Sequence, residues 1–228
     1  MDVQDLLTNS DEPVDLHGQV LQKARFQSAR LEGANFSRAD LTEANLSWAQ
    51  LRGANFEHAN LTKANMLSAD LRESNLYMVN MPEVILVDSN IKSANLIAAN
   101  LTGACITSAR LFNSRLNGAI LMNAKLWKAS AYALTCNDAV LKGADMSNVR
   151  LSYVELKRSD LTGVNLTDAY LHKVNLIGAD LTDAVLDRAN LVDVDLTGAN
   201  LTRTSFAGVM YGKTTIWPKG FDTSRLKA

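Results

Sequence analysis

Residues 29–65 read ARLEGANFSRADLTEANLSWAQLRGANFEHANLTKAN. A large apolar residue returns at every fifth position, and a small residue stands two places before it. We call the large residue the centre of each unit. The centres run without interruption from Leu16 to Phe206; of these 39 positions, 28 are leucine and nine are phenylalanine, methionine or isoleucine. Such an unbroken register leaves no net insertions and no long loops.

A period of five excludes a simple helix and a flat strand. Every fifth residue drifts by about 140° around an α-helix, and residues five apart in a strand face opposite sides. The chain must therefore turn within each unit. Ten of the twelve glycines stand two places after a centre, which predicts a corner with positive φ, as in a type II turn. Asn or Asp precedes the centre in 21 of the 39 units, where its side chain can bond nearby backbone.

Units such as Ala39-Asp40-Leu41, Ala99-Asn100-Leu101 and Ala199-Asn200-Leu201 fit the motif A(D/N)LXX. Over about residues 14–210 the chain resembles the pentapeptide-repeat family. The resemblance implies an all-β fold, a right-handed quadrilateral parallel β-helix with four units per coil and about ten coils. Residues twenty apart then stack on one another.

A solenoid exposes unpaired strand edges at its two ends, and the repeat is lost at both. The sequence predicts an N-terminal cap over residues 1–13, the β-helix over residues 14–210 and a C-terminal cap over residues 211–228. Tyr211, Ile216, Trp217 and Phe221 are the bulky residues of the second cap. They suit a plug over the last coil or, as in some family members, a dimer contact, so the chain is expected to be a monomer or a dimer through its C-terminal end.

Composition narrows the partners. Lys plus Arg number 23 and Asp plus Glu 24, a net charge of −1, which argues against a nucleic-acid binder. The sequence contains no apolar stretch of 18 residues and no leader with a basic and an apolar part. We therefore expect no membrane segment and no secretory signal, and we expect a cytoplasmic location. Cys136 is a centre and should point inward as a core residue, whereas Cys105 should point outward. Two cysteines that do not pair with each other fit a reducing compartment.

No catalytic or metal-binding constellation is evident. His17, His58 and His172 are scattered along the coils, and no phosphate-binding, nucleophile-elbow or zinc motif occurs. A solenoid without insertions offers no deep pocket. We therefore expect neither a cofactor nor a metal, and no enzymatic activity.

Two irregularities interrupt the pattern. In residues 129–136 the centre Ala131 is too small and the pre-centre Leu134 too large, so the two compensate in volume or the backbone bulges. Pro82 lacks a backbone donor, which predicts a local kink.

The middle of the chain carries a candidate partner-binding patch. Between Asp88 and Asp138 there is no Asp or Glu. By the register, aromatic and basic side chains point outward there on two adjoining faces, with Phe112 and Tyr132 stacked one above the other. We call this set the middle patch: Lys92, Arg110, Phe112, Lys125, Trp127, Lys128 and Tyr132. Exposed aromatics with basic neighbours are typical of interaction hot spots, although aromatics also decorate sheets for stability and the cations could hold an anionic ligand.

These observations favour a non-enzymatic scaffold or regulator that binds a protein of unknown identity. The ending TTIWPKGFD, residues 214–222, is similar to cyanobacterial members of the family, some of which regulate differentiation or signalling. The alternative is the DNA mimicry of the gyrase-binding, quinolone-resistance branch, which needs a continuous negative surface. Residues 157–203 hold seven acids against five bases, a thin excess.

Overall fold

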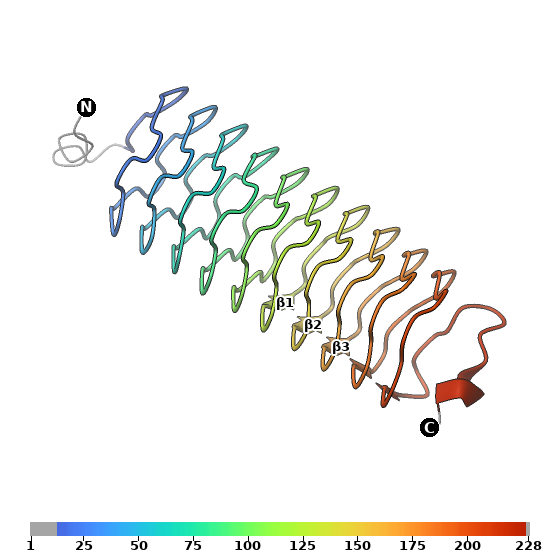
Figure 1. Ribbon diagram of the computed structural model, residues 1–228. Coiled ribbons are helices and arrows are strands. Elements are labelled where there is room, and N and C mark those ends of the chain that lie inside the picture. The colour runs from blue at the N-terminus through green and yellow to red at the C-terminus, as the bar shows by residue number, and fades with distance from the viewer. Residues whose placement is uncertain (1–12, 227–228) are drawn as a thin grey trace.

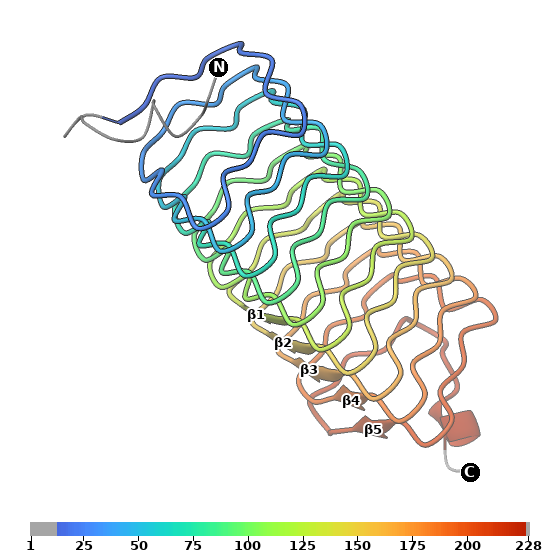
Figure 2. The ribbon, with the colours of Figure 1, turned by 60° about the vertical axis from the view of Figure 1, so that its left-hand side comes forward.

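The computed structural model describes residues 13–226. The chain winds as a rod of stacked coils from its N-terminal to its C-terminal end (Figure 1). Parallel strands stack along one side of the rod (Figure 2): β1 (Ser130–Tyr132), β2 (Arg150–Ser152), β3 (Tyr170–His172), β4 (Asn190–Leu191) and β5 (Met210–Tyr211). A short 3-10 helix, η1 (Thr223–Leu226), follows them. The expected all-β, right-handed β-helix is confirmed.

Backbone hydrogen bonds run between coils rather than within them. Paired residues lie twenty apart, as in Asp15 with Asn35 and Ser130 with Arg150. In the first coil, the amide of the centre Leu16 donates to the Asn35 carbonyl over 2.7 Å. Four units of five therefore make one turn of the solenoid, as the resemblance implies.

Each unit ends in a tight corner. The amide three places after the centre donates to the centre's own carbonyl, as Ala34 does to Leu31 over 3.1 Å. The residue two places after the centre has a φ between 52° and 69° in all 39 units. Ten of these residues are glycine, as expected for a type II turn, and 29 are not. The fold therefore imposes the left-handed conformation on side chains that seldom adopt it alone.

The centres and the small residues fill the axis of the rod. Leu41, Leu61 and Leu161 are completely buried, and the rings of Phe36 and Phe56 stack with centroids 4.9 Å apart. Cys136 is buried among them, and its desolvation raises the pKa of its thiol to about 12. Cys105 is half-buried, and neither cysteine forms a disulfide. Leucine convergence on the axis supplies the hydrophobic stabilisation of the rod.

The irregular segment is repacked and not bulged. Ala131 pairs with Leu151 and Arg115 with Thr135, so the twenty-residue register passes through the segment unchanged. Ala131 and Leu134 are both buried. A small apolar void of about 20 Å³ remains beside them, and its apolar walls favour a dry cavity.

The turn at Leu134 differs from the regular corner of the repeat. The turn bond from the pre-centre amide is stretched to 3.3 Å at Val79 and 3.4 Å at Val149, and Leu134 makes none. Among the described residues the bond is also missing for the valines of the next two coils on this face, Val154 and Val174. The bond is also missing at Ala139, whose side chain is small, and Val164 and Val209 keep it at 3.1 Å, so the size of the pre-centre side chain alone does not set it.

Pro82 causes no kink, and that expectation is wrong. Pro82 directly follows a centre, where the backbone amide has no ladder partner. The ladder bonds beside it persist, from Met81 to Asn100 over 2.9 Å and from Glu83 to Thr102 over 2.8 Å. Proline also suits this turn position because its fixed φ matches the first central residue of a type II turn.

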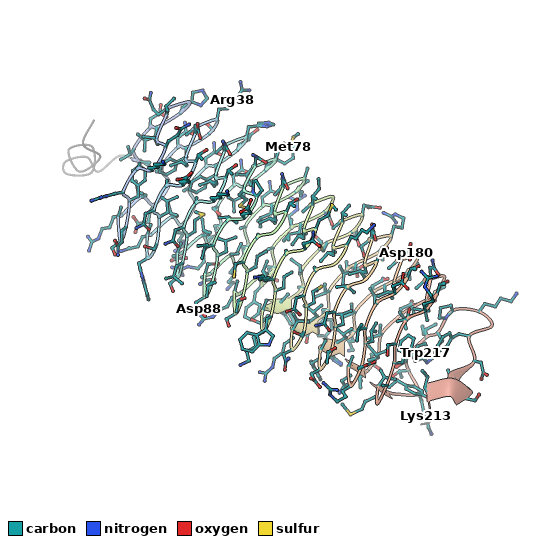
Figure 3. The ribbon with its side chains drawn as sticks, in the orientation of Figure 1. Arg38, Met78, Asp88, Asp180, Lys213 and Trp217 are labelled. Atoms are coloured by element: carbon teal, nitrogen blue, oxygen red, sulfur yellow. The ribbon has the colours of Figure 1, made fainter. Side chains whose placement is uncertain are left out.

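The repeat gives way to an aromatic cluster at the C-terminal end. Ile216 pairs with Asp195, a spacing of 21 residues instead of twenty. Trp217 packs edge-on against Phe206 at 5.7 Å and stacks on Phe221 at 4.9 Å, close to η1 (Figure 3). Packed against one another, these rings cover the end of the core. The N-terminal cap expected over residues 1–13 lies, apart from Pro13, outside the described residues.

Polar side chains form ladders of their own on the outside. Asn60, Asn80 and Asn100 each donate from Nδ2 to the side chain twenty residues earlier, over 2.9 to 3.3 Å. The Asn oxygens also accept from the amide two places on, as Asn35 does from Ser37 over 3.1 Å. The expected bonding of Asn to nearby backbone is confirmed, and the amide ladders add to the backbone ladder.

Ion pairs also join successive coils. Three arginines each donate two hydrogen bonds to the aspartate twenty residues earlier: Arg158 to Asp138, Arg188 to Asp168 and Arg203 to Asp183. Through these hydrogen bonds each arginine holds the pKa of its aspartate below the usual value. Because the pairs are exposed, each one contributes little to stability at neutral pH.

The repacked segment generates a first prediction. Leu134→Ala should destabilise the rod by about 2–5 kcal/mol because it leaves a cavity, and Ala131→Leu by about 1–3 kcal/mol because it overfills the core. The double variant restores the regular pattern and should lose clearly less than the sum of the two. Urea unfolding of all four proteins measures this. Additive losses would show that the two side chains do not compensate.

The coil-to-coil ion pairs generate a second prediction. The aspartate pKa is lower in the folded chain than the roughly 3.9 of an unfolded one. The unfolded state therefore takes up protons first, and the stabilisation, present above about pH 4, is lost as the pH falls through the folded pKa values. The thermal midpoint should drop below about pH 4, and less steeply in the triple variant R158Q/R188Q/R203Q. An unchanged profile in that variant would contradict the assignment.

Candidate protein-binding surface

Two adjoining faces of the rod carry the middle patch. The strand face holds β1 to β5, and its centres recur every twenty residues from Leu31 to Leu191. The Trp127 face precedes it along the chain, with centres from Phe26 to Phe206. Lys92, Arg110, Phe112 and Tyr132 lie on the strand face, and Lys125, Trp127 and Lys128 on the Trp127 face. The seven residues therefore lie on two adjoining faces. Trp127 and Lys128 stand at the corner between these faces, whereas Phe112 and Tyr132 stand at the far end of the strand face, directly before its next corner.

Trp127 and Lys128 form the corner itself. The Trp127 side chain is 39% exposed, a large fraction for an indole. The Lys128 Nζ lies over the indole ring, 3.9 Å from its centroid. The cation–π contact holds both side chains in place at the surface.

Phe112 and Tyr132 occupy successive coils but their rings diverge. The Asn113 amide donates to the Tyr132 carbonyl over 2.8 Å, which stacks the two units. Phe112 is half-buried, whereas Tyr132 is 50% exposed. The ring contacts of the described residues include no contact between Phe112 and Tyr132. Tyr132 packs instead against Tyr153, with ring centroids 5.2 Å apart.

Tyr153 starts a set of aromatic residues that the sequence analysis did not single out. Tyr153 meets His172 edge-on at 5.7 Å, and His172 stacks with Tyr170 at 6.3 Å. The Lys173 Nζ lies 5.0 Å from the Tyr153 ring centroid. We call Tyr132, Tyr153, Tyr170 and His172 the aromatic row. All four lie one or two residues from the centres of β1, β2 and β3. The twenty-residue register could therefore have predicted from the sequence that they lie close together.

The cations of this region form no ion pair with an acidic residue in the described part of the chain. Some arginines elsewhere are paired, as Arg52 is with Glu73 and Arg158 with Asp138. Among the described residues Arg25, Arg30 and Arg38 form no ion pair. None of the ion pairs formed within residues 13–226 includes a member of the following group: Lys92, Arg110, Arg115, Lys125, Lys128 and Arg150. The middle of the rod thus presents uncompensated positive charge.

The surface is hollowed next to the middle patch. An open hollow of about 470 Å³ lies on the corner between the two faces, lined by Asn148, Val149, Arg150, Asp168 and Tyr170. We call it the corner hollow. Arg150 pairs in the ladder with Ser130 and Tyr170, so the hollow begins one coil beyond Lys128. Both oxygens of Asp168 accept hydrogen bonds from Arg188, over 2.7 and 2.8 Å, and none of the ion pairs within residues 13–226 joins Asp168 to Arg150.

The described part of the chain holds no group of three or more His, Cys, Asp or Glu side chains arranged to bind a metal ion. Within residues 13–226 no helix reaches the length and apolarity that crossing a membrane requires.

The pattern of the family described as pentapeptide repeats matches residues 20–57, 49–88, 89–127, 135–168 and 165–203. No curated protein is similar enough to count as a match. One similar structure is HetL, a pentapeptide repeat protein involved in heterocyst differentiation regulation from the cyanobacterium Nostoc sp. strain PCC 7120. It is 28% identical, with 92% of this chain and 93% of HetL covered and a TM-score of 0.61.

Two further structures are more distant in shape. The pentapeptide repeat protein Rfr23 from the cyanobacterium Cyanothece 51142 is 32% identical over 45% of this chain and 63% of its own, with a TM-score of 0.21. QnrB1, a plasmid-mediated fluoroquinolone resistance protein, is 20% identical over 89% of this chain and 92% of its own, with a TM-score of 0.40. The matched repeats extend over most of the rod, and the chain belongs to the pentapeptide-repeat family.

Proposed function

We propose that this protein is a non-enzymatic scaffold or regulator that binds a protein partner through the middle patch. The observation that carries the proposal is the conjunction of exposed aromatic rings with cations that form no ion pair among the described residues, around a stretch without Asp or Glu between Asp88 and Asp138. Aromatic and basic side chains with this arrangement are typical of interface hot spots.

The rod geometry supports the same proposal. Backbone ladders and a filled axis fix the relative positions of Trp127 and Tyr132, so a partner meets a surface that needs little ordering before it binds. HetL, which shares the family and the rod, is involved in the regulation of heterocyst differentiation. That resemblance favours a regulatory role for this chain.

DNA mimicry is the second candidate, and the charge arrangement does not favour it. Some acidic residues in the C-terminal half are neutralised by arginines on the next coil, as Asp168 is by Arg188 and Asp183 by Arg203. The acid-free middle of the rod interrupts any negative stripe. A mimic of a DNA backbone needs unbroken negative charge.

Replacing the aromatic residues of the middle patch tests the proposal. The triple variant F112S/W127S/Y132S should fold as the parent does, by circular dichroism, yet lose the proteins that the wild-type chain captures from its host. A matched control replaces Trp48, Tyr77 and Met78, which lie outside the patch, by serine and should keep them. A captured protein must then bind purified chain and protect residues 110–132 from hydrogen exchange. Equal capture by the patch variant would overturn the proposal.

A supercoiling assay tests the second candidate. We expect the purified protein, added in large molar excess, to leave DNA gyrase activity unchanged, because the middle of the rod is positively charged. A heat-denatured sample of the same chain serves as the control for non-specific effects. Inhibition that depends on the folded protein would favour DNA mimicry over the scaffold role.

A further inference from the structure

The middle patch is continuous with the corner hollow and the aromatic row. Tyr132 belongs to both the patch and the row and contacts Tyr153 on the next coil. Arg150, in the hollow, pairs in the ladder with Ser130 of the previous coil. Ser130 in turn lies two residues from Lys128 and two from Tyr132 in the sequence. One surface therefore extends from Lys92 to Tyr170 over the strand face and its corner with the Trp127 face.

The charge of this surface specifies its complement. Six cations in the region form no ion pair with the acids that the structure describes, and the sequence between Asp88 and Asp138 contains no Asp or Glu. Interfaces place opposite charges across from each other, which speeds encounter and excludes wrong partners. The acids that complement these cations must then come from the partner.

The corner hollow has the donors for one carboxylate. Arg150 offers a planar guanidinium that can bind a carboxylate through two parallel hydrogen bonds. Tyr170, 41% exposed, brings a hydroxyl and Asn148 an amide to the same hollow, and Val149 gives it an apolar wall. Asp168 forms its ion pair with Arg188, and none of the ion pairs within residues 13–226 joins it to Arg150.

We propose that the surface binds an acidic segment of a partner protein, with one carboxylate in the corner hollow on Arg150 and an adjoining apolar side chain on the aromatic row. This inference rests on the proposed function and adds the chemistry of the partner. Six cations over several coils provide the long-range attraction, and the hollow provides the specific contact.

The rings favour a protein segment over a nucleic acid. Single-stranded nucleic acids stack their bases on open aromatic faces. Here one face of Trp127 is covered by Lys128, and Tyr153 meets both Tyr132 and His172 at steep angles of 57° and 88°. Ring edges and a hollow suit side chains better than a run of bases.

A displayed library of random twelve-residue peptides, selected on the immobilised full-length chain, tests the inference. We expect the recovered peptides to be rich in Asp and Glu next to apolar residues. Synthesised with a fluorescent label, they should bind in anisotropy titrations. Replacing their acids by the matching amides should weaken binding about tenfold or more, as expected for a charge-assisted hydrogen bond.

Variants of the chain locate the contact. Arg150→Gln should weaken the acidic peptide about tenfold or more and abolish most of the difference between the acidic and the amide peptide. The control Arg158→Gln removes an arginine on another face and should change affinity by less than about twofold. Both variants keep the core unchanged, and their thermal midpoints verify folding.

The outcomes separate the two proposals. If peptide binding is lost in F112S/W127S/Y132S but unchanged by Arg150→Gln and by the amide substitutions, the acidic-segment inference fails and the scaffold role stands. If binding survives the aromatic substitutions as well, both fail. A library without acidic enrichment or without binders also overturns the inference, as does a labelled twelve-nucleotide single strand that binds more tightly than every peptide through Arg150.

Discussion

The convergence of one large apolar side chain from every unit on a single axis is the constraint on which this protein depends. It holds only if the chain turns after each centre, and the turn forces 39 residues into positive φ. Twenty-nine of those residues are not glycine, and each is disfavoured in isolation. Burial of leucines and ladder bonds such as Leu16 to Asn35 offset that penalty, coil by coil.

Because the side chains of only two positions of every unit fill the axis, and the ladder is formed by the backbone, the side chains at the other three positions are free to vary. Along most of the rod they carry amide ladders and arginine–aspartate pairs, which strengthen the contact between coils. Around Trp127 and Tyr132 they do neither: the rings are exposed and the cations unpaired. This part of the surface is therefore distinguished by exposed rings together with unpaired cations, more than by any single residue.

The register made most of the fold predictable from the sequence. It placed Cys136 inside and the glycines at the corners, and it assigned the middle patch to two adjoining faces. It did not reveal the packing of Tyr132 on Tyr153 or the pairing of Asp168 with Arg188, because rotamers decide which neighbour a side chain meets. Pro82 was misjudged for another reason: its position has no ladder amide to lose, which only the hydrogen-bond pattern shows.

The four-sided turn has a consequence for how such a rod can change length. Removing twenty residues takes out one full revolution and leaves every later side chain on its original side. Removing five between Tyr132 and Arg150 would still give a well-filled axis, yet it would rotate Arg150 and all that follows by a quarter turn away from Trp127. A filled axis and the angular position of each side chain around the rod are thus separate properties of this chain. Only the second keeps Trp127 and Arg150 on one continuous surface.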